Sequence, residues 1–335
     1  MLIQEILLKS GPEKVVSPEK RLKEEAVKKT IQLRQLLAKK KILVLPGCYD
    51  AVTAKVIEKA GFPAAYLSGY GISAGLLGMP DAGLATMTEV HTVARYAANA
   101  VNIPLIADSD TGYGNAINVV RCVREYIQTG IAGIHIEDQV TPKRCGHVSG
   151  KELVPIEEAV GKYRAAAKTR DECDQDFLLI ARTDARGAVG GGLGEAIKRA
   201  NAYLDAGADV AFIEAPPSVE EIRRIVKEVK GPLLYNCTGI SPQLSAQELQ
   251  DLGFAIVIYP GAGLRAVVAG VYDLVADMKK RGTAAWLDFQ KRLESHPLKD
   301  LNAFLGFPEV RKMEEEFLPG EGVRKKYEAT LGYKL

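Results

Sequence analysis

The chain has 335 residues, of which 47% are hydrophobic and 26% charged, and its formal net charge is +2. These values are typical of a globular protein with a substantial core, and the near-neutral charge argues against nucleic acid or a membrane surface as a partner. No apolar run reaches the roughly 18 residues of a membrane helix, and no signal-peptide pattern is visible at the N-terminus. The cysteines have no CxxC pair and are odd in number, which favours free thiols in the cytoplasm: Cys48, Cys122, Cys145, Cys173 and Cys237.

Residues 1–40 form a polar, highly charged N-terminal extension. Ser17, followed by Pro18 and Glu19, predicts the start of a helix. Apolar residues recur between Val27 and Leu37 as a moderate helical stripe. We expect this helical segment to pack on the following domain or on a partner.

From residue 42 onward, short apolar runs alternate with amphipathic segments. Several amphipathic segments end in a glycine, the usual stop signal of a helix, as at Gly61, Gly130, Gly207 and Gly253. Alternating strands and helices predict parallel βα units, and eight such units close a (β/α)8 barrel. An open doubly wound sheet is the alternative, but no GxGxxG motif follows an early strand. The strand candidates are residues 42–45, 64–67, 103–107, 133–136, 177–181, 210–213, 233–235 and 255–258.

We therefore predict an α/β fold, a (β/α)8 TIM barrel over residues 41–285 with extra C-terminal helices. The tail after residue 267 shows no further strand pattern, and its helical stretches lie around residues 267–280, 284–294 and 308–317. A barrel needs only one helix after its last strand. We expect the surplus segment, 286–335, to make contacts between subunits.

The C-terminal ends of barrel strands carry the chemistry in this fold, and here most strand candidates are followed directly by polar residues. Asp108 and Asp110 follow the third candidate, and Glu137 follows the fourth. Crowded carboxylates repel one another, and a magnesium ion that keeps several waters relieves that repulsion. Ion pairs with Arg182 and Lys143 are the alternative. Arg182 itself is suited to grip a substrate carboxylate through two hydrogen bonds, or to pair with Glu214.

The segment 134–147 joins a β-branched strand to a polar loop that contains Cys145 and His147. A cysteine flanked by cations is prepared to ionise or to donate a proton, and a histidine two residues later extends that chemistry. A surface loop with an incidental cysteine is the alternative. His91, His135 and His296 lie inside predicted helices or strands, and we expect them to be structural.

Five motifs together resemble the isocitrate lyase/phosphoenolpyruvate mutase superfamily, over roughly residues 41–285. The resemblance implies a barrel whose last helix is exchanged between subunits, giving a homotetramer built as a dimer of helix-swapped dimers. It also implies a mobile gating loop around residues 140–150. The motifs are Tyr66-Leu67-Ser68-Gly69, Asp108-Ser109-Asp110-Thr111-Gly112-Tyr113-Gly114, His135-Ile136-Glu137-Asp138-Gln139, Lys143-Arg144-Cys145-Gly146-His147 and Ala181-Arg182-Thr183-Asp184-Ala185.

The same resemblance implies a site. Tyr66 takes the position of the family's base or hydroxyl-orienting tyrosine, and Cys145, with His147 beside it, that of the proton donor. Magnesium, or manganese in its place, would lie on Asp81, Asp108, Asp110 and Glu137, partly through water. The residues expected to bind substrate are Ser68, Gly69, Tyr70, Gly146, Arg182, Glu214, Asn236, Thr238 and Arg265.

The cysteine-containing loop is similar to that of the carbon–carbon lyase branch, which implies cleavage of a 2-hydroxy di- or tricarboxylate. We expect 2-methylisocitrate, split to pyruvate and succinate, because Arg265 matches an arginine of that group. The segment 236–242 is shorter than the corresponding loop, and Glu294 replaces a second arginine. The alternatives are therefore 2,3-dimethylmalate cleavage, oxaloacetate hydrolysis, a carboxyphosphonoenolpyruvate or phosphonopyruvate-type mutase and, more remotely, a non-catalytic barrel that only binds.

Overall fold

A computed structural model describes residues 27–318, 320 and 322 of the chain. These residues form two compact units that divide between Ala266 and Val267. The sequence predicts divisions after residues 40 and 285, and these stay predictions. The helix start predicted at Ser17 lies outside the described residues.

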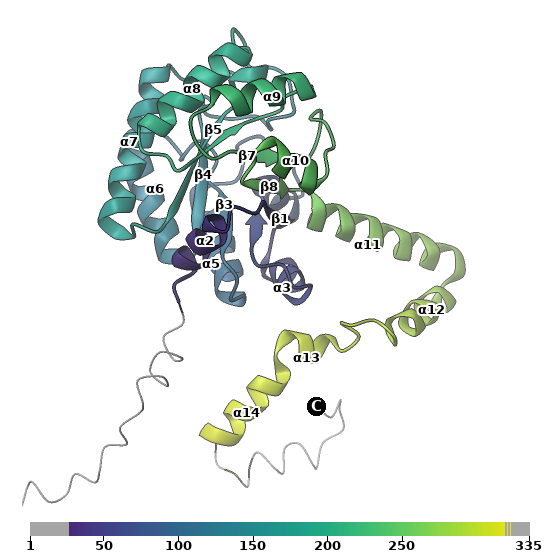
Figure 1. The fold of residues 1–335 in the computed structure, drawn as a ribbon. Helices are drawn as coiled ribbons and strands as arrows, with labels where there is room; N and C mark the ends of the chain where they lie inside the picture. The colour runs from purple at the N-terminus through teal and green to yellow at the C-terminus, as the bar shows by residue number, and fades with distance from the viewer. Residues whose placement is uncertain (1–26, 319, 321, 323–335) are drawn as a thin grey trace, which may run out of the picture. The chain divides into compact units, whose positions relative to one another are not determined.

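The first unit contains a parallel eight-stranded sheet with the order β6-β5-β4-β3-β2-β1-β8-β7. A parallel bridge between Ala211 and Leu233 joins the two ends of this order, so the sheet curls into a barrel inside a ring of helices (Figure 1). The predicted barrel is confirmed, and every predicted strand is present within a few residues. The strands are β1 (Leu43–Cys48), β2 (Ala65–Leu67), β3 (Leu105–Asp108), β4 (Gly133–Glu137), β5 (Leu178–Thr183), β6 (Val210–Ile213), β7 (Leu234–Asn236) and β8 (Ile256–Tyr259).

The helices between the strands begin and end at the residues whose chemistry predicts them. Asp50, Thr86 and Ser245 each accept a hydrogen bond from a backbone N–H of the first turn. Gly130 and Gly253 end their helices in the left-handed conformation, which glycine adopts without a steric penalty because it has no Cβ. The helices are α3 (Ala51–Lys59), α5 (Met87–Ala100), α6 (Ala116–Thr129), α7 (Ile156–Cys173), α8 (Leu193–Asp205), α9 (Val219–Glu228) and α10 (Ala246–Leu252).

Three short elements were not predicted. Residues after β2 form α4 (Gly69–Ile72), which runs directly into a π-helical turn, η1 (Ser73–Leu77). A three-residue 3-10 turn, η2 (Ala185–Gly187), follows β5. Each of these turns begins shortly after the C-terminal end of a strand, so they shape the rim of the barrel where function is expected.

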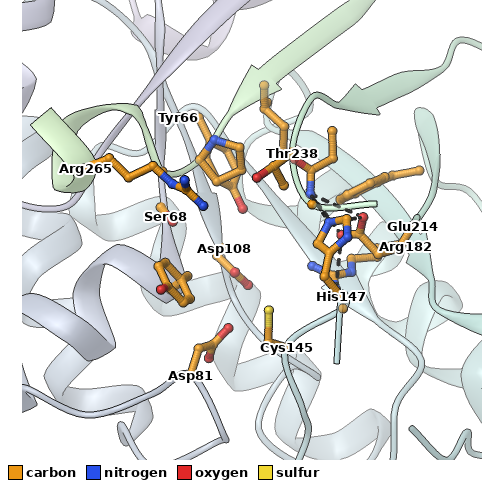
Figure 2. Close-up of a pocket in the computed structure, with 18 residues that line it drawn as sticks. Tyr66, Ser68, Asp81, Asp108, Cys145, His147, Arg182, Glu214, Thr238 and Arg265 are labelled. Atoms are coloured by element: carbon orange, nitrogen blue, oxygen red, sulfur yellow. Dashed lines mark hydrogen bonds and ion pairs between the residues drawn. The ribbon is translucent and has the colours of Figure 1, made fainter. Parts of the chain in front are cut away.

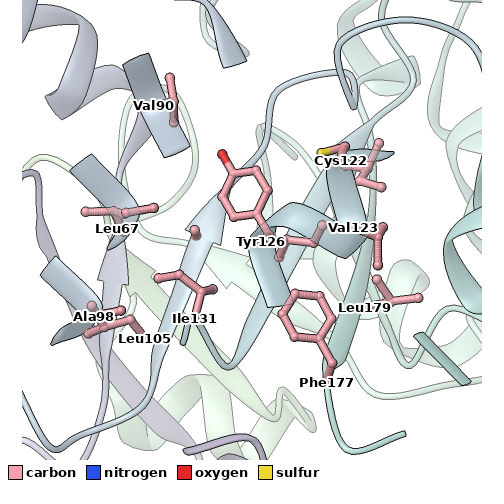
Figure 3. Close-up of a cluster of buried hydrophobic side chains, with 14 of the residues drawn as sticks. Leu67, Val90, Ala98, Leu105, Cys122, Val123, Tyr126, Ile131, Phe177 and Leu179 are labelled. Atoms are coloured by element: carbon pink, nitrogen blue, oxygen red, sulfur yellow. The ribbon is translucent and has the colours of Figure 1, made fainter. Parts of the chain in front are cut away.

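The core has an inner and an outer layer. Alternate strand residues fill the barrel interior, including Leu45, Ile106 and Phe212, while their neighbours pack outward against the helices. Figure 3 shows part of the outer layer, where Tyr126 and Phe177 lie among aliphatic side chains of the strands and helices. This packing holds the C-terminal ends of all eight strands in fixed relative positions.

The helix α2 (Lys29–Ala38) covers the N-terminal end of the barrel. Leu33 is fully buried with the interior side chains, and Arg34 bonds Asp209 at 2.9 Å and the backbone carbonyl oxygens of Asp176 and Phe177. This confirms that the segment packs on the barrel. The helix thus closes the end of the barrel opposite the strand exits.

Replacing Leu33 with alanine is expected to destabilise the protein by about 2–5 kcal/mol, because it removes buried methyl groups and leaves a cavity. Urea unfolding measures the change. Gln35→Ala is the matched control, since Gln35 is exposed on the same helix. A loss below about 1 kcal/mol in the Leu33→Ala protein would show that α2 does not seal the barrel.

The remaining helices are α11 (Ala262–Arg281), α12 (Thr283–Leu293), α13 (Leu301–Leu305) and α14 (Phe307–Phe317). All but α11 belong wholly to the second unit, and α11 begins in the first. Several large apolar side chains of the second unit are exposed, among them Val271, Tyr272, Trp286 and Leu287. Among the described residues, no helix is long and apolar enough to cross a bilayer.

Candidate active site

A cavity of about 170 Å³ opens at the C-terminal ends of the strands. Most of the predicted site residues line it. The exceptions are Gly69, Asp110 and Glu137, which do not contact the cavity directly. Figure 2 shows Asp81, Asp108 and Cys145 gathered around one part of the cavity, with Arg182, Glu214 and His147 in another. The predicted residues that line it are Tyr66, Ser68, Tyr70, Asp81, Asp108, Cys145, Gly146, His147, Arg182, Glu214, Asn236, Thr238 and Arg265.

One wall of the cavity is acidic. Asp108 is the last residue of β3, and Asp110 follows in a turn where its φ is +47°. The ammonium of Lys143 lies 2.6 Å from Asp81 and 2.8 Å from Asp110, so a cation from the Cys145 loop balances both carboxylates. Burial raises the pKa of Asp110 to about 6 despite Lys143. Ion pairing, one of the two alternatives for this cluster, is therefore present.

Glu137 ends β4 and is almost fully buried behind the cavity. Its nearest cation is the Arg182 Nε at 3.2 Å, yet neither carboxylate oxygen has a hydrogen-bond partner. Burial raises the pKa of Glu137 well above its usual value, although Arg182 and Lys143 oppose that shift. Two buried acceptor oxygens without donors are costly, which is a reason to expect a further positive group beside them.

Within the described residues, no three acidic, histidine or cysteine side chains converge closely enough to form a ready metal centre. Three of the four predicted ligands instead divide between two cations, and the fourth, Asp108, lies 3.6 Å from the Nε2 of His135. Asp81 and Asp110 contact Lys143, and Glu137 lies beside Arg182.

Arg182, on β5, is the centre of a buried charge network. Its guanidinium donates to both oxygens of Asp184, at 2.9 and 3.1 Å, and lies 3.3 Å from Glu214. The ring of Phe212 packs 5.3 Å from the guanidinium carbon, in cation–π geometry. These carboxylates raise the pKa of Arg182 although burial lowers it, so the side chain stays charged. Both roles foreseen for Arg182 are compatible, because it contacts Glu214 and also faces the cavity.

Glu214 and His147 meet on the wall beside Arg182. The His147 Nε2 lies 3.2 Å from the Glu214 carboxylate, and the Ile240 N–H donates to the other ring nitrogen at 3.4 Å. The ring therefore accepts from the backbone at Nδ1 and faces Glu214 with its Nε2. Burial tends to raise the pKa of Glu214, but Arg182 and His147 bring it to about 2. The His147 side chain thus ties the Cys145 loop to the strand ends.

Gly239 allows His147 to approach. Its φ is +63°, and a Cβ built on it would lie 2.2 Å from the His147 Nδ1. Gly239→Ala is therefore expected to displace His147 and lower kcat at least about tenfold, because a small misplacement of catalytic groups is costly. Gly190→Ala is the matched control, since Gly190 has a similar φ of +69° but no neighbour within 4 Å. Equal activity of the two purified variants in a steady-state assay would contradict this role.

Cys145 is half-buried and lines the same cavity as Asp108. Burial raises the pKa of its thiol, and the nearby Asp81 adds to that shift. The neighbouring cation Lys143 is engaged by Asp81 and Asp110, so it does not promote the thiolate. Burial therefore favours the protonated thiol, which is the form that proton donation requires.

Tyr66 lies on β2, with its hydroxyl 2.7 Å from the Nε2 of His135. His135 is buried, which lowers its pKa to about 4 and keeps the ring neutral at pH 7. Burial also raises the pKa of Tyr66 well above its usual value, with Asp108 contributing. A tyrosine that retains its proton orients a substrate hydroxyl more readily than it removes a proton from it.

The turn after β2 shapes the cavity floor. The Ser68 hydroxyl accepts a hydrogen bond from the Gly71 N–H and so caps α4. A Cβ on Gly69 would lie 2.6 Å from an oxygen of Asp108, so only glycine permits this close approach. Tyr70 is more exposed, and it stands at the edge of the cavity.

On the wall toward β7 and β8, Asn236 donates to both oxygens of Glu214, and Thr238 lines the cavity. Arg265 also lines it, and no carboxylate of the described residues lies within ion-pair distance of its guanidinium. Thr238 and Arg265 are shared with a second, more open cavity of about 430 Å³ that also contacts Cys237 and Tyr259.

Several contributors to the site were not predicted from the sequence. Asp184 holds Arg182, Phe212 packs on it, and Gly239 admits His147. Gln139 contacts the Cys145 loop through its side chain. Asp184 and Gln139 lie inside the motifs noted above, and that position could have identified them as site residues. The roles of Phe212 and Gly239 depend on contacts with residues distant in sequence, which no local pattern indicates.

Comparison with known proteins gives consistent matches. The family described as phosphoenolpyruvate phosphomutase matches residues 33–279. A 2,3-dimethylmalate lyase of Eubacterium barkeri is 44% identical over 291 residues, covering 86% of this chain and 98% of the relative. A 2-methylisocitrate lyase of Aeropyrum pernix is 44% identical over 253 residues, 75% of this chain and 80% of the relative.

Solved structures agree with these relatives. A crystal structure of 2,3-dimethylmalate lyase superimposes with a TM-score of 0.82 and 35% identity, covering 92% of this chain and 99% of that one. A phosphonopyruvate hydrolase in complex with oxalate and Mg²⁺ gives a TM-score of 0.78 and 34% identity, covering 88% and 100%. The barrel, the residues of its cavity and these matches together show that the chain is an enzyme of the isocitrate lyase/phosphoenolpyruvate mutase superfamily.

Proposed function

We propose that this enzyme is a magnesium-dependent carbon–carbon lyase that cleaves a 2-hydroxy di- or tricarboxylate. The observation that supports this most strongly is the placement of the Cys145 thiol and the Asp108 carboxylate on one cavity. A thiol whose pKa is raised by burial is a proton donor, and it faces acidic residues suited to a hard cation.

The metal would be held by Asp81, Asp108, Asp110 and Glu137. Their donor atoms are all oxygens, and Glu137 keeps two buried oxygens without hydrogen-bond partners, which fits a hard divalent cation. Mg²⁺, with Mn²⁺ as a substitute, suits side chains that do not converge tightly, since it keeps several waters of its own. When bound, the ion supplies positive charge that stabilises oxygen charge developing on the substrate.

The chain's own residues would then act as follows. The Tyr66 hydroxyl, backed by His135, orients the substrate's 2-hydroxyl group, and the Arg182 guanidinium holds a carboxylate. As the carbon–carbon bond breaks, the 2-hydroxyl group loses its proton to a carboxylate of the acidic wall and its oxygen becomes the carbonyl oxygen of one fragment, while the electron pair of the broken bond passes to a carbon of the second fragment. The Cys145 thiol donates its proton to that carbon, and the other fragment leaves as a 2-oxo acid.

For the substrate, we propose 2-methylisocitrate, cleaved to pyruvate and succinate. Arg265 supports this choice, because its guanidinium has no ion-pair partner among the described residues and lies on the cavity wall, where it can bind a third carboxylate. A second candidate is 2,3-dimethylmalate, which has only two carboxylates. The similarity to the Eubacterium barkeri enzyme over 86% of this chain favours it.

The test compares kcat/KM for the two acids in the parent enzyme and in Arg265→Met. If the tricarboxylate is the substrate, the parent prefers it, and the substitution lowers kcat/KM for it at least about tenfold, as loss of a charged hydrogen bond requires. Preference for 2,3-dimethylmalate, unaffected by Arg265→Met, would establish the second candidate. Phosphorus NMR with phosphonopyruvate separates both from mutase or hydrolase chemistry on phosphonates, and an oxalate assay detects oxaloacetate hydrolysis.

We also propose that the enzyme assembles as a homotetramer, a dimer of helix-swapped dimers. The exposed apolar side chains of the second unit, such as Val271 at 56% and Tyr272 at 69%, support an additional partner for α11. Light scattering on the parent and on Tyr272→Asp tests this. A monomeric parent would contradict it, whereas a tetramer that dissociates in the variant agrees with it.

A further inference from the structure

The loop that contains Cys145 stands on two paired segments. The Val140 N–H donates to the Glu152 carbonyl at 2.9 Å, and the Val154 N–H donates to the Asp138 carbonyl at 3.0 Å. An antiparallel bridge joins Gln139 to Leu153 between these bonds. The base of the loop is therefore fixed by backbone hydrogen bonds. These bonds do not themselves restrain the eleven residues between Val140 and Glu152.

Within that span, the side chain of Gln139 reaches forward and holds Arg144. Its Nε2 donates to the Arg144 carbonyl at 2.9 Å, and its Oε1 accepts from the Arg144 N–H at 2.9 Å. The Gln139 amide thus pairs with both the N–H and the carbonyl of Arg144, as the backbone of a neighbouring β-strand would. Gln139 is only 1% exposed, so movement of the loop away from it leaves a buried amide without partners.

Lys151 holds the other side of Cys145. Its ammonium donates to the carbonyl of Gly146 and, at 3.2 Å, to that of Val148. Lys151 is buried, and no carboxylate of the described residues lies within ion-pair distance of its ammonium. Its backbone is held by a bridge and a hydrogen bond to residues 188 and 189. Opening of the loop would deprive a buried cation of both acceptors, which is unfavourable.

We propose that Gln139 and Lys151 are positioning residues that hold the Cys145 thiol in the cavity by bonding the backbone on each side of it. Neither residue lines the cavity, so neither is a catalytic residue. The inference rests on the proposed function in one respect, that Cys145 donates a proton there. The position of the thiol itself is independent of which reaction the enzyme catalyses.

The test measures alkylation of each cysteine by iodoacetamide, resolved by peptide mass spectrometry, in the full chain and in Gln139→Glu and Lys151→Met. Glutamate keeps the size and the acceptor of Gln139 but cannot donate to the Arg144 carbonyl. We expect the alkylation rate of Cys145 to rise at least about fivefold in both variants, since loop opening exposes its half-buried thiol. Cys173, which is exposed, is the internal standard and should react at an unchanged rate.

Gln247→Glu is the control for the chemical change, because Gln247 lies on α10 and, within the described part of the chain, its side chain bonds only Asp251. It should leave the Cys145 alkylation rate and kcat within twofold of the parent. In Gln139→Glu and Lys151→Met, kcat on the cleaved acid should fall at least about tenfold, with a smaller change in KM, because the proton donor and not substrate binding is disturbed.

The alkylation rate of Cys145 decides the inference even if no acid is cleaved and the proposed lyase function fails. An unchanged rate in a folded Gln139→Glu or Lys151→Met protein overturns the positioning role of that residue. If Gln139→Glu does not fold, the alkylation rate of Cys145 in Lys151→Met alone decides whether the two residues position the thiol. If both rates rise while kcat stays at the parent value, Gln139 and Lys151 do position the thiol, and the proposed acid role of Cys145 is the part that is overturned.

Discussion

Replacing Cys145 with alanine is expected to lower kcat by about 10²–10⁴-fold, the usual contribution of a positioned general acid. The thiol lines the cavity with a pKa raised by burial, and in the proposed mechanism it supplies the proton that the released carbon needs. Steady-state cleavage of the preferred acid measures the effect. A serine variant tests the chemistry more finely, because a hydroxyl occupies nearly the same space but is a much weaker acid.

Binding of magnesium with pyruvate, followed by calorimetry, should survive in both Cys145 variants, since the thiol is not among the proposed metal ligands. Cys173→Ser is the matched control, because Cys173 is exposed at the end of α7 and away from the cavity lining. Full turnover by the serine variant would refute the acid role. Loss of magnesium–pyruvate binding would show instead that the substitution had damaged the cavity.

Replacing Arg182 with methionine is expected to destabilise the fold by about 3–5 kcal/mol and to abolish activity, because removing one partner of a buried ion pair leaves uncompensated charge. Here the charge left behind is large. Asp184, Glu137 and Glu214 all lie within 3.3 Å of the guanidinium, and all are buried. Chemical unfolding, with activity measured on the folded fraction, gives both effects.

Arg186→Met is the matched control for that substitution. Arg186 pairs with Glu221 at 2.6 Å, but both side chains are partly exposed, at 30% and 22%. A pair of this kind contributes about 0–1 kcal/mol. Equal destabilisation by the two substitutions would mean that the Arg182 network does not organise the barrel rim.

The architecture could be predicted from the sequence because its signals are local. Apolar runs separated by amphipathic segments identify every strand, and glycines such as Gly130 and Gly253 end helices through their own backbone freedom. The convergence of Asp108 and Arg182 also follows, since parallel strands bring their C-terminal ends to one rim.

The state of the charged groups could not be predicted in this way. Cations next to Cys145 in sequence left both ionisation and proton donation open, but Lys143 contacts Asp81 and Asp110, and burial then dominates the pKa of Cys145. Spacing along the chain does not tell which partner a flexible side chain selects. Only the packed structure determines the burial that sets the pKa.

The turn after β2 and the contacts of the loop were missed for a related reason. Ser68 and Gly69 were predicted as substrate-binding residues, whereas Ser68 also caps α4, a helix of four residues. Such a short helix leaves no periodic pattern to detect. Gly239 and His147 are 92 positions apart in the sequence, so no local pattern predicts their contact.

Metal-dependent cleavage of a carbon–carbon bond is the central claim for this enzyme. The decisive measurement incubates the enzyme with a panel of 2-hydroxy di- and tricarboxylates, with magnesium or with EDTA, and identifies the products by mass. We expect one member to yield a 2-oxo acid and a shorter carboxylic acid in equal amounts, with magnesium and not with EDTA. Cleavage that persists in EDTA, or a magnesium-loaded enzyme that splits no member of the panel, would contradict it.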